Sequence, residues 1–204
     1  VELTEIILPT SKTGKQVGLD LGITDLATLS DGTKIGAPKP LKSKLKKLQR
    51  LSKSLSRKQK GSANRAKAKT KLSRLHYQIG CIRKDFLHKL TTQLITNYDT
   101  IAIEDLNVKG MVKNRKLARS INDLGFYELK RQLIYKANQW GKIIKSVDRF
   151  FPSSKTCSVC QNKVETLPLS MRTWQCLHCQ TTHDRDINAS LNILHHANKV
   201  LTLA

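Results

Sequence analysis

Acidic residues are scarce in this sequence. Its 204 residues include 15 aspartates and glutamates against 37 lysines and arginines, which gives a formal net charge of +22 at pH 7. Like charges at this density repel one another, and the release of counterions from phosphates is a common source of binding free energy for such a surface. We therefore expect a polyanionic partner, with nucleic acid favoured and an anionic membrane surface as the alternative.

Long apolar runs are also missing. No stretch approaches the roughly 20 apolar residues of a membrane span, and the amino-terminal residues lack the pattern of a secretion signal. We therefore expect a cytoplasmic protein that does not enter a membrane. Aromatic residues make up only 5% of the chain, so contacts with the nucleic-acid backbone are favoured over extensive base stacking. No serine or cysteine nucleophile motif is present.

Four of the five cysteines form two close pairs, CSVC and CLHC. Cys157 and Cys160 are separated by two residues, as are Cys176 and Cys179, and 15 residues lie between the pairs. This spacing is typical of a structural zinc ribbon, in which four thiolates close the tetrahedral shell of one ion. Redox dithiols, core cysteines and an iron site are the alternatives. We place this module at residues 152–183 and interpret the remaining cysteine, Cys81, as a core residue.

A basic segment without any acidic residue runs from position 39 to position 84. Leucines recur through it at helical spacing, Gly61 and Ser62 interrupt the pattern, and a second apolar stripe follows. We predict an antiparallel helical hairpin over residues 39–97 whose polar faces bind phosphates, a merely solvated face being the alternative. The expected contact residues are Lys46, Lys47, Arg50, Lys53, Arg57, Lys58, Arg65, Lys67, Lys71 and Arg74.

Three acidic residues stand at the ends of apolar elements. Asp20 lies in VGLDLG, Glu104 in IAIEDL and Asp186 in DRDINAS. Each one alone is more often a loop or helix cap than a catalytic group. If the strands that carry Asp20 and Glu104 are neighbours and the last helix packs across them, the carboxylates converge. Together they could bind hard divalent cations such as magnesium and support phosphodiester hydrolysis.

The remaining pattern indicates the order of elements. VELTEIILP at the start predicts a strand, and KQVGLDLG, LATLS and TKIG predict a three-stranded meander. After the hairpin come a buried strand, TIAIEDL, a helix over residues 123–140, the strand KIIKSV, the cysteine module and a final amphipathic helix. We predict an α/β protein with a mixed sheet and flanking helices.

A family resemblance combines these motifs. GLDLGITDLATLSDG, IAIEDLNVKGM, FFPSSKTCSVC, CLHC and HDRDINASLNI, in this order, resemble the carboxy-terminal part of the transposon-encoded TnpB (OrfB) family, which is related to type V CRISPR effector nucleases. The resemblance implies an RNase H-like (RuvC-like) DNA endonuclease guided by an RNA. It also assigns Asp20, Glu104 and Asp186 as the catalytic triad, with two magnesium ions for which manganese could substitute.

The resemblance further implies a division of the chain. Residues 1–151 are expected to form the nuclease core with the hairpin, 152–183 the zinc ribbon, and 184–204 the third motif and final helix. Asp184 rivals Asp186 for the third position of the triad. Full-length relatives carry an additional amino-terminal recognition half that this sequence lacks, so the chain could be a fragment, an inactive remnant or a complete product.

Other readings remain open at this point. A non-catalytic zinc-ribbon nucleic-acid-binding protein, a ribosome-associated protein and a strand-joining transposase fit parts of the pattern. Trp174, Phe150 and Phe151 are interpreted as packing residues around the ribbon. Gln161 occupies a position where the family often has glycine, which we expect to weaken the ribbon slightly. Arg185 is expected either to contact phosphate or to form a helix-end salt bridge.

Overall fold

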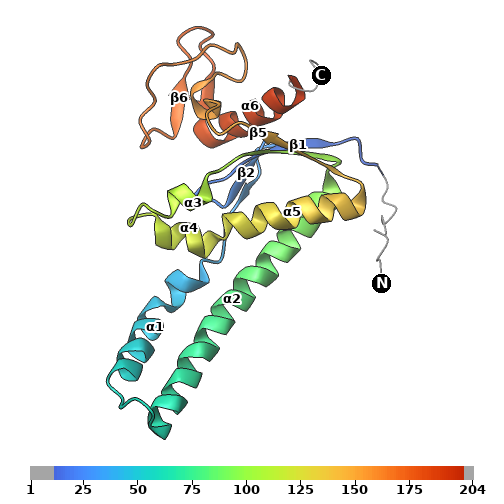
Figure 1. The fold of residues 1–204 in the computed structure, drawn as a ribbon. Coiled ribbons are helices and arrows are strands. Elements are labelled where there is room, and N and C mark those ends of the chain that lie inside the picture. The colour runs from blue at the N-terminus through green and yellow to red at the C-terminus, as the bar shows by residue number, and fades with distance from the viewer. Residues whose placement is uncertain (1–11, 200–204) are drawn as a thin grey trace.

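The computed structural model describes residues 12–199 (Figure 1). The strand predicted for residues 1–9 lies outside this range. The elements, in chain order, are β1 (Gln16–Asp20), β2 (Ala27–Leu29), β3 (Lys34–Ile35), α1 (Pro40–Ser56), α2 (Ala63–Asn97), β4 (Thr100–Glu104), α3 (Val108–Met111), α4 (Ala118–Leu124), α5 (Phe126–Trp140), β5 (Ile143–Val147), the 3₁₀ helix η1 (Ser153–Lys155), β6 (Thr173–Gln175), β7 (Thr182–Asp184) and α6 (Arg185–Lys199).

The main sheet is mixed, with the strand order β3-β2-β1-β4-β5. Strands β1, β2 and β3 are antiparallel neighbours, which confirms the predicted meander. Strand β4 runs parallel to both β1 and β5. In the register of β1 and β4, Leu19 lies opposite Ile103. The carboxyl ends of these two strands therefore lie side by side.

Helices cover both faces of the sheet. Figure 1 shows α6 on one face and α2 and α5 on the other. Side chains alternate along each strand. Thus Leu19 and Ile103 belong to the large core beneath α2 and α5, whereas Ala102 packs against Ile193 of α6. The sheet is consequently buried between two helical layers.

Gly18 lets α6 approach the sheet closely. A Cβ atom at this position would lie 2.0 Å from the backbone oxygen of Ser190, a separation that no real pair of atoms tolerates. A residue with any side chain would push the helix away from β1. The absent side chain thereby sets how near the part of α6 around Ser190 comes to the middle of β1.

The predicted helical hairpin is confirmed as α1 and the first part of α2, which extend away from the sheet (Figure 1). Ser62 caps α2 by accepting a hydrogen bond from the backbone of Arg65 at 3.2 Å. The carboxylate of Asp123 accepts backbone hydrogen bonds at 2.9 Å from Leu41 and Lys42, and so caps α1 from a distant part of the chain. This long-range cap fixes where the hairpin leaves the domain.

The helix expected over residues 123–140 is confirmed as α5, although it begins at Phe126 because Gly125 adopts a left-handed conformation with φ 73°. The short helix α4 before it was not predicted. Cys81 was expected in the core but is exposed. Within residues 12–199, no helix is both long enough and apolar enough to cross a membrane.

Candidate metal centre and carboxylate site

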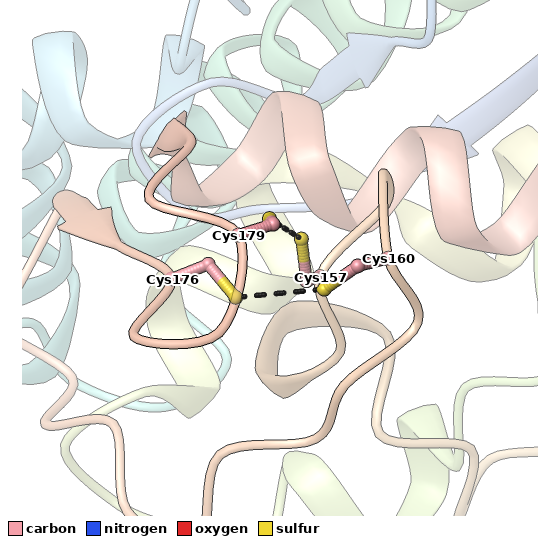
Figure 2. A group of neighbouring side chains, drawn as sticks. All are labelled: Cys157, Cys160, Cys176 and Cys179. Atoms are coloured by element: carbon pink, nitrogen blue, oxygen red, sulfur yellow. Dashed lines mark hydrogen bonds between the residues drawn. The ribbon is translucent and has the colours of Figure 1, made fainter.

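The four paired cysteines converge as predicted (Figure 2). Their Sγ atoms all lie within 4.8 Å of one another, and the Cys157–Cys179 and Cys160–Cys176 separations are both 3.6 Å. Tetrahedral ligation at a zinc–sulfur distance of 2.3 Å places the sulfurs roughly 3.8 Å apart. The four thiols therefore have the spacing that a zinc ion requires.

Each cysteine pair is followed by a glutamine in a left-handed backbone conformation. Gln161 has φ 62° and Gln180 has φ 61°. Their backbone N–H groups donate to the carbonyls of Cys157 at 2.9 Å and Cys176 at 2.8 Å, which closes the two turns. The sequence indicated this strain at Gln161, but the same conformation at Gln180 was missed although it holds the equivalent position after the second pair.

His183 contacts the cluster without belonging to it. Its Nε2 atom lies 3.0 Å from the Sγ atom of Cys157, and its ring packs against Trp174 with centroids 4.8 Å apart. Burial lowers the pKa of His183, which favours the neutral ring. A neutral imidazole can donate one N–H to a thiolate, the kind of contact that orients a metal ligand. His178, the other histidine near the cysteines, is exposed.

Two asparagines of α6 attach the cysteine module to the domain. The backbone N–H of Ser158, inside the first cysteine pair, donates to Asn188 at 2.9 Å. The side-chain amides of Asn188 and Asn192 donate to the carbonyl of Thr156 at 2.7 and 2.6 Å. The same helix therefore carries Asp186 and holds the module in place.

The three predicted carboxylates line one hollow. Asp20 ends β1, Glu104 ends the neighbouring strand β4, and Asp186 lies in the first turn of α6. The hollow has a volume of about 440 Å³. Its other lining residues are Leu21, Gly22, Phe151, Pro152, Ser153, Ser154, Lys155, Lys163 and Arg185. Residues from the sheet, the module and α6 thus meet around the carboxylates.

The carboxylates disfavour one another's charge. Burial and, after it, the nearby charges of Asp186 and Glu104 raise the pKa of Asp20 to about 7, against the opposing effect of Arg185 and Arg172. Burial also raises the pKa of Glu104. Without a cation this part of the fold holds negative charge at a cost in free energy.

Asp184 and Asp105, the acidic residues nearest in sequence to Asp186 and Glu104, form ion pairs with basic side chains outside the hollow. Asp184 pairs with Lys34 at 2.7 Å and accepts backbone hydrogen bonds from Asp186 and Ile187 at 3.1 Å, so it caps α6. Asp105 pairs with Lys130 at 2.7 Å and also with Arg149.

Asp186 differs from these two acids. Its ion pair is with the exposed Arg172, at the longer distance of 3.4 Å. The geometry favours Asp186 over Asp184 as the third member of the set, because Asp184 already serves as a cap and a salt-bridge partner.

Seven of the ten predicted contact residues of the hairpin line two hollows. Lys47, Lys71 and Arg74 line a groove of about 530 Å³ between α1 and α2. A second hollow, of about 370 Å³, is lined by Arg50, Lys53, Ser54, Arg57 and Lys58. Lys46 and Lys67 are exposed outside both hollows. Arg65 has a structural role, because its guanidinium donates to the carbonyls of Leu55 at 3.0 Å and Lys58 at 2.9 Å and so ties α2 to the end of α1.

The aromatic residues near the ribbon behave differently from one another. Trp174 is buried among the cysteines, as predicted. Phe151 instead stacks on His196 of α6, with centroids 4.1 Å apart. Phe150 is 86% exposed, so its interpretation as a packing residue was wrong. Arg185 donates to the carbonyl of Pro168 at 2.7 Å in place of the helix-end salt bridge, and its contact with phosphate stays a prediction.

These observations define a class of protein: a mixed α/β domain joined to a four-cysteine metal-binding module, with acidic residues converging where the two meet. The sequence pattern of OrfB_IS605, described as "Probable transposase", matches residues 1–115. A second pattern, "Cas12f1-like, TNB domain", matches residues 126–193. The chain therefore belongs to the OrfB_IS605 transposase family, also known as TnpB.

Curated relatives agree with this membership. The chain is 46% identical over 190 residues to a "Putative RNA-guided DNA endonuclease" of Streptomyces pristinaespiralis, covering 93% of this chain and 47% of the relative. It is 38% identical over 213 residues to "Putative RNA-guided DNA endonuclease InsQ" of Escherichia coli K12, covering 97% and 53%. The chain spans about half the length of these relatives.

A solved structure shares the fold. The match is to a chain of the "Cryo-EM structure of the Cas12f1-sgRNA-target DNA complex", with a TM-score of 0.61 and 18% sequence identity. It covers 87% of this chain and 49% of the other. At this level of identity the likeness concerns the arrangement of helices and strands.

Proposed function

We propose that this chain is the nuclease part of a transposon-associated, RNA-guided DNA endonuclease with an RNase H-like, RuvC-like core. Asp20, Glu104 and Asp186 are its catalytic residues and magnesium ligands. The observation that supports this most directly is the convergence of these three side chains, from two adjacent parallel strands and one helix, on a single hollow.

The chemistry of the hollow fits divalent cations. Carboxylate oxygens are the ligands that magnesium and manganese prefer. Burial and repulsion from Asp186 and Glu104 raise the pKa of Asp20, and positive charge between the carboxylates would relieve that repulsion. They are not as tightly grouped as the four cysteines, which suits two ions held about 4 Å apart. Two such ions would activate water and stabilise the leaving oxygen.

Two cationic side chains that line the hollow could bind a phosphate. Lys163, from the cysteine module, and Arg185, from α6, line the same space as the carboxylates. A phosphodiester held by these groups would have its backbone positioned without any reading of its bases. The proposed substrate is therefore DNA bound through its backbone at the junction of the domain and the module.

The cysteine module is proposed to hold one structural zinc ion. Four thiolates fill a tetrahedral shell and leave no position for water, so this ion would stabilise the fold and take no part in hydrolysis. We propose that the nuclease core occupies residues 1–151, the ribbon 152–183, and the third motif with its helix 184–204. The bonds from Asn188 and Asn192 support this division, because they connect the ribbon to the third segment.

Guide RNA and DNA are the proposed partners. The relatives in Streptomyces and Escherichia are named RNA-guided DNA endonucleases. The hairpin groove lined by Lys47, Lys71 and Arg74 offers positive charge for phosphates. Guided cleavage by the whole protein would also draw on the part of the relatives that this chain does not span.

The test is cleavage of single- and double-stranded DNA by the purified chain with magnesium or manganese, with and without RNA from the transposon end. We expect cleavage that Asp20→Ala abolishes while binding persists or strengthens, because the substitution removes repulsion of phosphate. Asp85→Asn is the matched control, since this acid is exposed on α2 and pairs with Lys89. Equal cleavage by the Asp20→Ala variant would refute the assignment.

A second candidate function is nucleic-acid binding without catalysis, favoured by the net charge of +22. It predicts tight, salt-sensitive binding together with no magnesium-dependent cleavage under any of these conditions. The same assay therefore separates the two functions.

A further inference from the structure

We propose that the ring of Phe150 stacks on an unpaired nucleobase of single-stranded DNA bound at the carboxylate hollow. This inference rests on the proposed nuclease function, which it extends by naming the state of the substrate and a residue that positions it.

Phe150 is an exposed aromatic residue on an ordered turn. Its side chain is 86% exposed, although single exposed apolar residues are common and carry no meaning alone. Its backbone, however, is fixed: the N–H group donates to the side chain of Asp148 at 2.8 Å. The next N–H group, of Phe151, donates to the carbonyl of Asp148 at 3.1 Å. These bonds fix the backbone of the turn from which the exposed ring projects.

Phe151 anchors the other side of this turn. Its ring stacks on His196 at a centroid distance of 4.1 Å and packs with the cluster formed by Ala102, Val147 and Ile193. One aromatic ring of the pair is thus used for packing and the other is left free. Because the backbone of this turn is already ordered, little backbone entropy is lost when a ligand stacks on Phe150.

The turn lies at the carboxylates. Phe151 and Pro152 line the hollow that contains Asp20, Glu104 and Asp186. Arg149 lines a second hollow, of about 420 Å³, which also includes Glu104. Phe150 itself lines neither hollow, but in the chain it lies between Arg149 and Phe151, which border them. Its ring would therefore meet a base beside the bound phosphate.

The combination of groups is typical of single-strand binding. Cations that follow the backbone and aromatic rings on which bases stack are the two components of such sites. Here Lys163 and Arg185 supply the first and Phe150 the second. In a duplex the faces of each base are covered by its neighbours, so a ring can stack only where the strand is unpaired. The geometry therefore favours an unwound strand as the substrate.

The experiment measures binding of a single-stranded DNA oligonucleotide without added magnesium, so that no cleavage is needed for a result. One abasic nucleotide is moved along the strand, and each oligonucleotide is titrated with the wild-type chain and with Phe150→Ala. We expect Phe150→Ala to weaken binding of the intact strand by about 5-fold or more, as for loss of one stacked base. At one abasic position the wild-type and variant affinities should become equal.

Three further variants sharpen the result. Phe150→Trp and Phe150→Tyr should retain binding, whereas Phe150→Leu should lose most of it, because an aromatic face is required and an apolar side chain is not enough. Leu169→Ala is the matched control, since Leu169 is an 81% exposed apolar residue of the cysteine module. It should bind as the wild type does.

Two results would overturn the proposal. Unchanged affinity of Phe150→Ala would mean that the exposed ring serves another contact, such as one with a protein segment. A loss of affinity that persists at every abasic position would mean that the ring contacts the backbone only. Neither outcome depends on cleavage, so failure of the nuclease assignment at Asp20 would be seen separately.

Discussion

The ionised carboxylate of Asp20 lowers the stability of the folded chain. Its pKa is about 7 in the folded chain, well above the ordinary aspartate value of 3.8, because of burial and the charges of Asp186 and Glu104. Between these two values the folded chain binds more protons than the unfolded chain. Stability is therefore lost as the pH rises from about 4 to about 7, and the cost is complete above the folded pKa.

We accordingly expect Asp20→Asn to raise the melting temperature at pH 8 when no magnesium is added. At pH 4 the difference should be small, since the carboxyl of Asp20 is then largely protonated in the fold. Thermal unfolding followed by circular dichroism measures this, without a chelator that would also strip the cysteine cluster. Added magnesium should stabilise the wild type more than the variant. A variant less stable than the wild type at pH 8 would contradict this account.

His183 contacts one of the four cysteines of the candidate zinc site. Its Nε2 atom lies 3.0 Å from the sulfur of Cys157. We expect His183→Phe to speed the release of the ribbon metal to a chromophoric chelator by roughly 10-fold or more, because loss of such an outer contact commonly weakens metal binding 10- to 100-fold. His183→Gln should recover part of the effect by restoring a donor. The exposed His178→Phe serves as control, and equal release rates for both phenylalanine variants would disprove the role of His183.

At the scale of elements, α6 determines the geometry of the site. It carries Asp186, holds the cysteine module through Asn188 and Asn192, and lies directly over Gly18 of β1. The position of the third carboxylate, that of Asp186, therefore depends on a glycine in strand β1. Sequence spacing shows neither the contact nor its closeness.

We expect Gly18→Ala to lower the melting temperature by about 5 °C or more, because the added methyl group would meet Ser190 at 2.0 Å and force α6 away from β1. Cleavage measured below the melting temperature should also fall, since Asp186 moves with the helix. Gly80→Ala is the control: a Cβ there meets nothing within 4 Å, and alanine favours the interior of α2. Wild-type stability of Gly18→Ala would contradict the packing described.

At the scale of the whole molecule, the basic hairpin lies apart from the carboxylate hollow. The hairpin extends from one face of the sheet, while α6 and the cysteine module lie on the other (Figure 1). Backbone binding along the hairpin and hydrolysis at the carboxylates should therefore respond to different substitutions.

Replacing Lys47, Lys71 and Arg74 by glutamine should weaken DNA binding and reduce its dependence on salt. If each contacts one phosphate of a single strand, the slope of log K against log salt should fall in magnitude by about 2. Fluorescence anisotropy over a range of salt concentrations measures the slope. The control replaces Lys89 and Arg131, which already pair with Asp85 and Glu128. An unchanged slope in the triple variant would remove the groove from the binding surface.

Much of the fold could be predicted from the sequence because its signals are local. Two residues between paired cysteines determine which sulfurs can share an ion, and the Sγ separations agree with that expectation. Apolar spacing and Gly61 with Ser62 predicted the hairpin, which the structure forms as α1 and α2. Asp31-Gly32 and the short apolar runs predicted the meander, which is formed by β1, β2 and β3.

The errors concerned which side of an element is covered. Cys81 lies two residues beyond the buried Ile79 in α2, so the two side chains point about 200° apart around the helix. Arg65 looked like any other cation of the hairpin, but the return of α2 beside α1 places it against the carbonyls of Leu55 in α1 and of Lys58 in the turn that follows. Phe150 and Phe151 are adjacent and chemically identical, yet one is packed and the other is displayed.

The sequence by itself determined which residues can carry chemistry: the cysteine ligands, the acidic residues at strand ends and the excess of positive charge. Only the tertiary structure decided which of those acids share a hollow. Asp184 and Asp105 have the same chemistry as Asp186, but long-range partners, Lys34 for one and Lys130 for the other, neutralise them. The reason is physical: spacing along a chain sets local geometry, whereas the packing of α6 over Gly18 sets which distant groups meet.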